Sequence, residues 1–338
     1  MANRVNHSRF FLILFIAAVH LTGCQGQKTF GTEYLNLEKS IAMPGVKGRI
    51  DHIDVDIKNR TAYIAALGNN TLEIIDLQNG KLIHSITGLD EPQGVAYIPK
   101  QQEIFVANGG NGECYFFNAV SFKKTGTVKL ASDADDVRYD SAAQKIYVGY
   151  GQGAIAVIDA VTHQQSGTAG FKGHPESFQL DNSSNTIYVN VPDKNNITVI
   201  NASKLIVRET WKCVNASANF PMAFDPQNHR VFVGYRSPAR LEVRNSETGT
   251  EINTYTMVGD ADDLYYDEIK HRIYVSGGGG FINIFQQQDS NTYTQLANIP
   301  TRKGARTSFL IPSLQLLLVN ARAESGQNAE LMVYKVNK

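Results

Sequence analysis

Short apolar runs recur along this chain at a nearly constant interval. They occupy residues 61–65, 104–107, 146–149, 187–190, 231–234, 273–276 and 317–320. Their central aromatic or leucine residues stand at 63, 105, 147, 188, 232, 274 and 318, so successive intervals are 42, 42, 41, 44, 42 and 44 residues. Apolar runs of this length between turn-forming residues predict β-strands. The fixed period predicts a repeat architecture with seven units.

The third unit shows the pattern inside one repeat. Strands are predicted at 136–140, 146–150 and 154–159, with a fourth around 165–170, and polar or glycine-rich turns separate them. Helical periodicity is missing from these segments. Four strands in each of seven repeats predict an all-β chain folded as a seven-bladed β-propeller.

The two ends of the propeller predict how its ring closes. The last repeat supplies strands at 308–311, 316–320 and 330–336, and a further strand-like segment lies at 33–37. Pairing that N-terminal strand with the last blade would complete it and protect its edge. The alternative is a ring that closes without such an exchange.

Residues 1–23 have the pattern of an export signal. Basic residues precede the apolar run 10–19, which is too short to span a bilayer comfortably as a helix. The run leads to Leu21-Thr-Gly-Cys24, which resembles the bacterial lipobox, where cleavage precedes a cysteine that carries the lipid. The sequence thus predicts a lipoprotein signal peptide at 1–23, a lipidated Cys24 with a tether at 24–32, and the propeller at 33–338. Acyl chains on Cys24 would anchor the protein to a bacterial membrane, facing the periplasm from the outer membrane in a Gram-negative cell.

Several phrases of the sequence resemble a known family. The tetrads that begin at Ile146, Ile187 and Ile273 are Ile-Tyr-Val followed by Gly, Asn or Ser. They resemble the bacterial YVTN-repeat β-propeller family, and the resemblance covers residues 33–338. The segments 68–76, 91–94, 174–177 and 259–263 resemble one exported branch of that family. The resemblance implies the fold and export, and it carries over no catalytic residues.

Composition narrows the classes of function. The chain has 32 Lys and Arg against 32 Asp and Glu, so its formal net charge is zero. A nucleic-acid binder would need a basic excess, and we expect no nucleic-acid partner. Three cysteines are too few for a disulfide-stapled scaffold. Apart from Cys24, Cys114 and Cys213 lie in strand-like runs and are predicted to be free, buried thiols.

The repeat register predicts where a site would lie. Loops that lead into the first strand of each blade surround the mouth of the central channel. Counting back equally from each marker gives a first ring of positions: Asp51, Gln93, Asp135, Glu176, Phe220, Asp262 and Arg306. The following positions form a second ring: His52, Gly94, Asp136, Ser177, Pro221, Asp263 and Thr307. We predict a ligand site made of Asp51, His52, Gln93, Asp135, Asp136, Glu176, Asp262, Asp263 and Arg306.

The acidic character of these rings allows two interpretations. Crowded carboxylates raise one another's pKa values, and a cation would relieve the repulsion. One divalent cation (Ca²⁺, Mn²⁺ or Zn²⁺) would suit oxygen ligands with one imidazole, and the predicted ligands are Asp51, His52, Asp135, Glu176 and Asp262. Alternatively, the acids accept hydrogen bonds from turn amides, and Arg138 and Arg306 neutralise the rest.

These observations favour a binding or scaffold module over an enzyme. Nucleophile-elbow and zinc-protease helix motifs are absent from the sequence. We expect a monomer that presents its loop face to an envelope protein or a glycan, with Tyr235, Arg236 and Arg240 on the rim. The alternative is a hydrolase similar to propeller lactonases, with a divalent cation in the acidic mouth.

Overall fold

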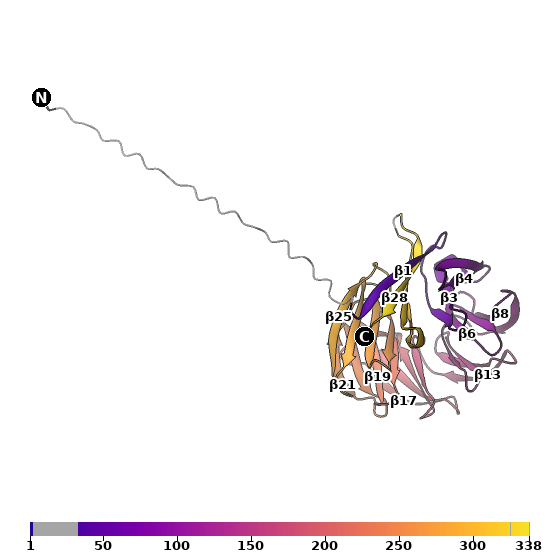
Figure 1. Ribbon diagram of the computed structural model, residues 1–338. Helices are drawn as coiled ribbons and strands as arrows, with labels where there is room; N and C mark the ends of the chain where they lie inside the picture. Colours follow the sequence, from indigo (N-terminus) through magenta and orange to yellow (C-terminus); the bar gives the residue numbers. More distant parts are fainter. Residues whose placement is uncertain (3–32, 325, 338) are drawn as a thin grey trace.

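The computed structural model describes residues 1–2, 33–324 and 326–337. This part of the chain contains 28 strands in seven four-stranded antiparallel sheets, which are the blades of a propeller (Figure 1). The predicted seven-bladed, all-β fold is confirmed. The predicted lipidation site Cys24, the predicted tether and the predicted signal peptide beyond residue 2 lie outside the described residues. Within the described residues, no helix has the length and apolar composition that crossing a bilayer requires.

The first three blades follow one another along the chain. Blade 1 contains β2 (Ile53–Asp56), β3 (Thr61–Ala66), β4 (Thr71–Asp76) and β5 (Lys81–Ile86). Blade 2 contains β6 (Pro92–Ile98), β7 (Glu103–Asn108), β8 (Glu113–Asn118) and β9 (Lys124–Lys129). Blade 3 contains β10 (Ala134–Asp140), β11 (Lys145–Tyr150), β12 (Ala154–Asp159) and β13 (Gln164–Gly170), close to the four strands predicted there.

The remaining blades have the same order. Blade 4 contains β14 (Phe178–Asp181), β15 (Thr186–Val191), β16 (Asn196–Asn201) and β17 (Ile206–Lys212). Blade 5 contains β18 (Ser217–Asp225), β19 (Arg230–Ser237), β20 (Ala239–Asn245) and β21 (Glu251–Thr256). Blade 6 contains β22 (Ala261–Asp267), β23 (Arg272–Gly277), β24 (Phe281–Gln287) and β25 (Tyr293–Pro300). Single 3₁₀ turns occupy η1 (Leu67–Asn69), η2 (Pro192–Lys194) and η3 (Pro312–Leu314).

Blade 7 closes the ring by strand exchange between the chain ends. It contains β26 (Ser308–Ile311), β27 (Leu316–Ala321), β28 (Ala329–Val336) and the N-terminal strand β1 (Leu35–Met43). Strand β1 runs antiparallel to β28, with Leu35 opposite Val336 and Met43 opposite Ala329. The predicted exchange is confirmed and the alternative closure is wrong. The predicted bounds 33–37 begin two residues early and end six residues short, because residues 36–40 are mostly polar and exposed and a register shift between Leu37 and Lys39 interrupts the alternation.

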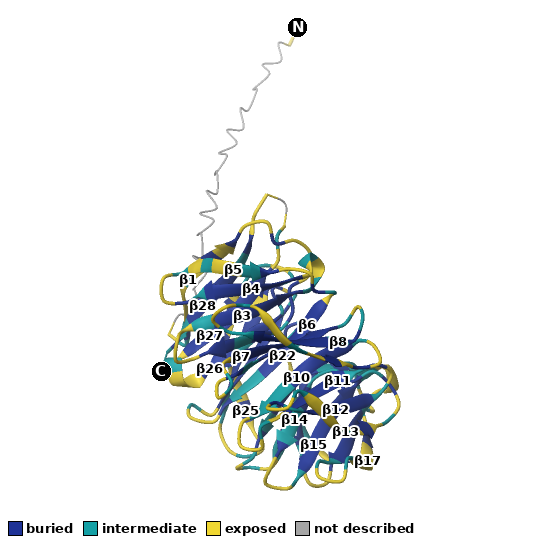
Figure 2. Ribbon diagram, turned by 90° about the vertical axis from the view of Figure 1, so that its right-hand side faces the viewer, coloured by how far each residue is buried: buried dark blue, intermediate teal, exposed yellow. Residues whose placement is uncertain are grey.

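The hydrophobic core lies between blades. Each of the seven apolar clusters combines residues of two neighbouring blades, so every sheet is covered on both faces. The marker residues of the repeats, from Tyr63 to Leu318, lie on the second strands and are all buried. Figure 2 shows exposure gathering in the loops, while second and third strands such as β11, β12 and β15 are mostly dark blue and the inner strands β10 and β14 are partly teal. The 42-residue period is therefore the period of this packing.

The two faces of the ring carry different loops and different ends of the strands. The entry face carries the loops that lead into each inner strand (β2, β6, β10, β14, β18, β22 and β26) and the loops between second and third strands. Because Leu35 pairs with Val336, at the far end of β28, strand β1 starts at the opposite face. A tether attached there would leave the entry face pointing away from its anchor.

Candidate functional site

The register argument locates one cavity. All seven first-ring positions line a cavity of about 270 Å³ at the entry face: Asp51, Gln93, Asp135, Glu176, Phe220, Asp262 and Arg306. His52 lines it as well, whereas Asp136 and Asp263 lie below it, around a second cavity. The structure thus brings the predicted site residues together around one channel, at two levels.

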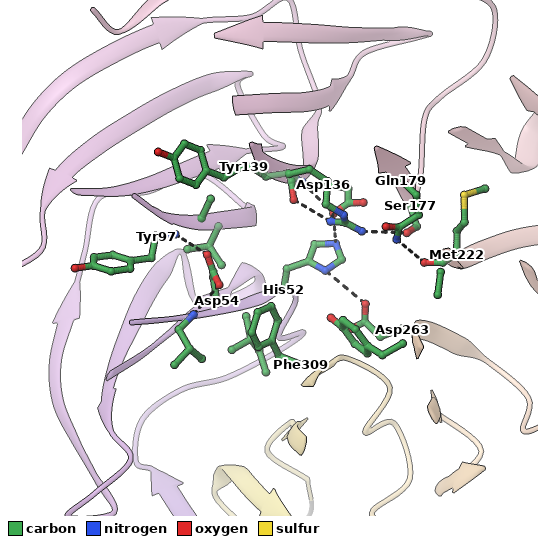
Figure 3. A pocket seen from close by; sticks show the side chains of 18 of the residues that line it. His52, Asp54, Tyr97, Asp136, Tyr139, Ser177, Gln179, Met222, Asp263 and Phe309 are labelled. Atoms are coloured by element: carbon green, nitrogen blue, oxygen red, sulfur yellow. Dashed lines mark hydrogen bonds and ion pairs between the residues drawn. The ribbon is translucent and has the colours of Figure 1, made fainter. Parts of the chain in front are cut away.

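His52 occupies the level between the two cavities. Its Nε2 atom lies 3.8–3.9 Å from carboxylate oxygens of Asp51, Asp135 and Asp136, and its Nδ1 atom lies 3.9 Å from Asp263. Figure 3 shows the imidazole between Asp136 and Asp263. These contacts are longer than hydrogen bonds and act as ion pairs when the imidazole is protonated.

The electrostatic field of the carboxylates around His52 favours its protonated imidazole. Burial by itself would lower the pKa of His52, but the surrounding carboxylates of Asp136, Asp51, Asp263 and Asp135 outweigh it and raise that pKa to about 10. Burial raises the pKa of Asp51 to about 7, with Asp135 and Asp262 adding to the rise and His52 opposing it. His52 is therefore an imidazolium that holds several carboxylates together at neutral pH.

Asp136 and Asp263 join neighbouring blades. The backbone N–H of Phe178 in blade 4 donates to Asp136 at 3.3 Å, and that of Ser308 in blade 7 donates to Asp263 at 2.7 Å. Asp54 accepts in the same way from Tyr97 of blade 2 at 2.6 Å. Each inner strand has one edge without a partner strand, so these carboxylates satisfy N–H groups that would otherwise lack an acceptor. Asp136 and Asp263 therefore accept backbone hydrogen bonds, but from a strand of another blade and not from the turn amides that the sequence suggested.

A second, larger cavity continues the channel toward the opposite face. Its volume is about 490 Å³, and it is lined by the later residues of the inner strands. Figure 3 shows Asp54, Tyr97, Tyr139 and Phe309 around it, with His52 at its inner end. The channel is therefore divided into a polar mouth and an aromatic-lined lower chamber.

One side of the mouth is basic. Arg306 pairs with Asp260 at 3.0 Å and with Asp262 at 2.6 Å. Arg236 pairs with Asp262 and stacks on Phe220, with its guanidinium carbon 3.6 Å from the ring centroid. Asp262 is thus held by two guanidinium groups, and Arg49 likewise pairs with Asp51 at 3.1 Å.

The expected rim residues fall in different places. Arg236 reaches the mouth, as expected of a rim residue. Tyr235 is fully buried and its hydroxyl donates to Glu242, so the expectation of an exposed rim tyrosine was wrong. Arg240 pairs with Glu242 and Glu251 on the blade itself. Strand β19 runs three residues beyond the apolar tetrad 231–234, so Tyr235 is a strand residue and packs in the apolar cluster between blades 4 and 5.

The other side of the mouth contains a residue that the register argument missed. His174 lies in the loop from β13 to β14, two residues before Glu176, and its Nε2 atom is 3.5 Å from Asp135. Gly173 has a φ of +98°, and a Cβ there would overlap Asp193 and Val191. This close approach and the buried Pro175 against Gly149 fix the loop so that His174 turns into the mouth. The tripeptide His-Pro-Glu was the available signal, but the register argument used only the first-ring position and the one after it in each blade, and His174 lies two residues before the first ring.

The ligand atoms of Asp135, His174 and Glu176 all lie within 4.8 Å of one another. Burial raises the pKa of Glu176 well above its ordinary value, and Asp135 adds to the rise. Among the described residues, no side chain donates a hydrogen bond to the Glu176 carboxyl. Of the five predicted metal ligands, Asp135 and Glu176 belong to this group. Asp51 and Asp262 pair with arginines, and His52 lies among carboxylates below the group.

The fold and the channel define a seven-bladed β-propeller with a polar axial site. No family model matches the chain, and no curated protein matches it. The structure is similar to a chain in the "Crystal Structure of Mitotic Checkpoint Complex", with a TM-score of 0.74, 18% identity and all of both chains covered. This is one of 1846 similar chains among solved structures, so the likeness shows a widespread fold and leaves function to the site.

Proposed function

We propose that this protein is a lipid-anchored, extracytoplasmic binding module of the YVTN type that captures its partner at the entry-face mouth of the channel. The observation that carries the proposal is the convergence of all seven first-ring positions, from seven separate blades, on one polar cavity. A ring needed only for packing would repeat one residue type, whereas these seven positions hold four acids, an amide, an aromatic ring and an arginine.

The charges of the mouth suggest what it binds. Arg306 lies on blade 7, and the acids Asp135 and Glu176 lie on blades 3 and 4, across the ring. The arginine side suits an anionic group, while the acidic side suits a cation, either an ammonium group of the partner or a metal ion. An envelope peptide or glycan that carries charges of both signs fits this arrangement.

The position of β1 supports presentation toward the aqueous compartment. Because β1 starts at the face opposite the mouth, a lipid on Cys24 would hold that opposite face toward the membrane. Replacement of Cys24 by serine should move the protein from the membrane fraction to the soluble fraction. Retention of the Cys24→Ser variant in washed membranes would contradict lipid anchoring.

The binding proposal is tested with soluble peptide and glycan fragments released from the bacterial envelope. We expect the chain to bind one class of fragment by calorimetry in the presence of chelator. Binding should fall at least about tenfold in Arg306→Gln, since a charge-assisted contact contributes about 1.5–3 kcal/mol. Arg208→Gln, on the outer strand β17, is the matched control. Equal binding by both variants would refute a ligand site at the mouth.

A second candidate function is a metal-dependent hydrolase similar to propeller lactonases. The cluster of Asp135, His174 and Glu176 favours it, because two carboxylates and one imidazole leave coordination positions for water and a carbonyl oxygen. Lactone hydrolysis by the metal-loaded chain, lost in Glu176→Gln, would favour this function over binding alone. A loaded chain that turns over no lactone or ester would exclude it.

A further inference from the structure

The orientation of His174 is set by acceptors on one side of its ring. Its Nδ1 atom lies 2.8 Å from the backbone oxygen of Gly151 and 3.3 Å from a carboxylate oxygen of Asp133. Since both partners are acceptors, Nδ1 carries a proton. Burial would lower the pKa of His174, but its contacts with Asp135, Gly151 and Asp133 raise it to about 9, so a metal ion would displace the proton on Nε2 and bind the lone pair there. Metal-binding histidines are commonly held by this kind of N–H to carbonyl contact.

The Nε2 atom faces two carboxyl groups. Asp135 lies 3.5 Å away, which is longer than a good hydrogen bond, and Glu176 contributes an oxygen within the same 4.8 Å group. Bond lengths of about 2.0–2.2 Å to a tetrahedral cation place ligand atoms about 3.4 Å apart. Small side-chain rotations would bring the three ligand atoms to that spacing. Glu176 would lose no hydrogen bond in rotating, because no described side chain donates one to its carboxyl group.

The surroundings balance the charge of a cation. Asp133 lies beside His174 on the outer side, and Asp51 lines the same cavity. Arg49 pairs with Asp51 at 3.1 Å, and His52 lies 3.8–3.9 Å from Asp51, Asp135 and Asp136. Arg236 and Arg306, in the same cavity, pair with Asp262. Among the described residues, no arginine or lysine pairs with Asp135 or Glu176, and His52 lies 3.8 Å from Asp135.

We propose that Asp135, His174 and Glu176 bind one first-row transition-metal dication of the Zn²⁺ type in the channel mouth. One nitrogen and at most four carboxylate oxygens suit Zn²⁺ better than Ca²⁺, which takes six to eight oxygens. The open coordination positions face the cavity. The site deepens the proposed function, because the cation would serve as the positive partner on the acidic side and would receive an anionic or carbonyl oxygen of the ligand.

The test is titration of the metal-free full chain with Zn²⁺ and, separately, with Ca²⁺, followed by calorimetry. We expect one equivalent of Zn²⁺ to bind at least about tenfold more tightly than Ca²⁺. His174→Gln and Glu176→Gln should each weaken Zn²⁺ binding by more than the roughly 100-fold that loss of an outer partner costs. Loading with Co²⁺ should give a visible d–d absorption that both variants lose.

A control and a second ligand variant identify the ligands. His163→Gln removes a histidine that also pairs with a carboxylate, Glu103 at 2.8 Å. His163 lies in the turn between β12 and β13, at the face opposite the mouth, and its replacement should leave Zn²⁺ affinity unchanged. Glu176→Gln keeps the side-chain volume, so it covers the case in which His174→Gln fails to fold. Zn²⁺ binding that survives His174→Gln, or an unmodified chain that binds no Zn²⁺, would overturn the proposal. Binding of envelope fragments is measured in the presence of chelator, so a failure of the Zn²⁺ proposal would leave that result unchanged. The metal-site proposal and the binding-module proposal can therefore fail separately.

Discussion

Replacement of His52 by glutamine tests whether a single imidazolium holds the channel together. The variant keeps a polar side chain of similar length and removes the charge that faces Asp51, Asp135, Asp136 and Asp263 at 3.8–3.9 Å. At neutral pH these carboxylates would then repel one another in a largely buried place, where His52 itself is only 22% exposed. We expect the variant to fold with lower stability.

The magnitude follows from the pKa of His52. One pKa unit corresponds to about 1.4 kcal/mol, so the rise from 6.5 to about 10 sets an upper limit of about 5 kcal/mol. Protonation of Asp51, whose pKa is already about 7, recovers part of that loss. We expect His52→Gln to lower the free energy of unfolding by about 2–4 kcal/mol near pH 6.

The direction of the pKa shift determines how the stabilisation by His52 changes with pH. The folded pKa of His52 lies above the unfolded value, so its stabilisation is complete below about pH 6.5 and is lost as pH rises through about 10. Urea unfolding followed by circular dichroism at about pH 6 and about pH 10.5 should therefore show a large difference from the parent chain and then a small one. His84→Gln, on the exposed outer strand β5, is the control. A loss below about 1 kcal/mol near pH 6, or a difference that does not shrink at high pH, would refute the reasoning.

Three further predictions concern packing. A Cβ at Gly94 would overlap the backbone oxygen of Asp135 and a methyl group of the next blade. Gly94→Ala should therefore lower the free energy of unfolding by about 1–3 kcal/mol, measured by urea unfolding. Gly170→Ala, where a Cβ meets open space, should leave that free energy unchanged. Ile41→Ala in the ring-closing strand should cost about 2–4 kcal/mol, and Leu37→Ala on its exposed side much less; equal losses would contradict a packed β1. Burial raises the pKa of the Cys114 thiol, so a thiol reagent should label it only after unfolding, and rapid labelling of the native chain would show that the position is accessible.

Much of the channel geometry could be predicted because a repeat fixes it. A period of about 42 residues places equivalent positions of different blades at one height around one axis, and Asp51, Asp135, Glu176 and Asp262 met there as the register required. The same argument could not tell which acids hold blades together. Asp136 and Asp263 serve as acceptors for the next blade because their side chains point toward its inner strand, and side-chain direction at a strand entry depends on the loop before it.

The sequence by itself determined the number of blades, the strand exchange that closes the ring and the height at which polar residues gather, because all three follow from the spacing of apolar runs. The tertiary structure alone decided the partners. It surrounded His52 with four carboxylates, which makes it a cation, and it turned His174 toward Asp135 and Glu176 through a loop bent at Gly173. Those outcomes depend on the packing of one blade against another and on single backbone angles, and neither leaves a periodic signal in the chain.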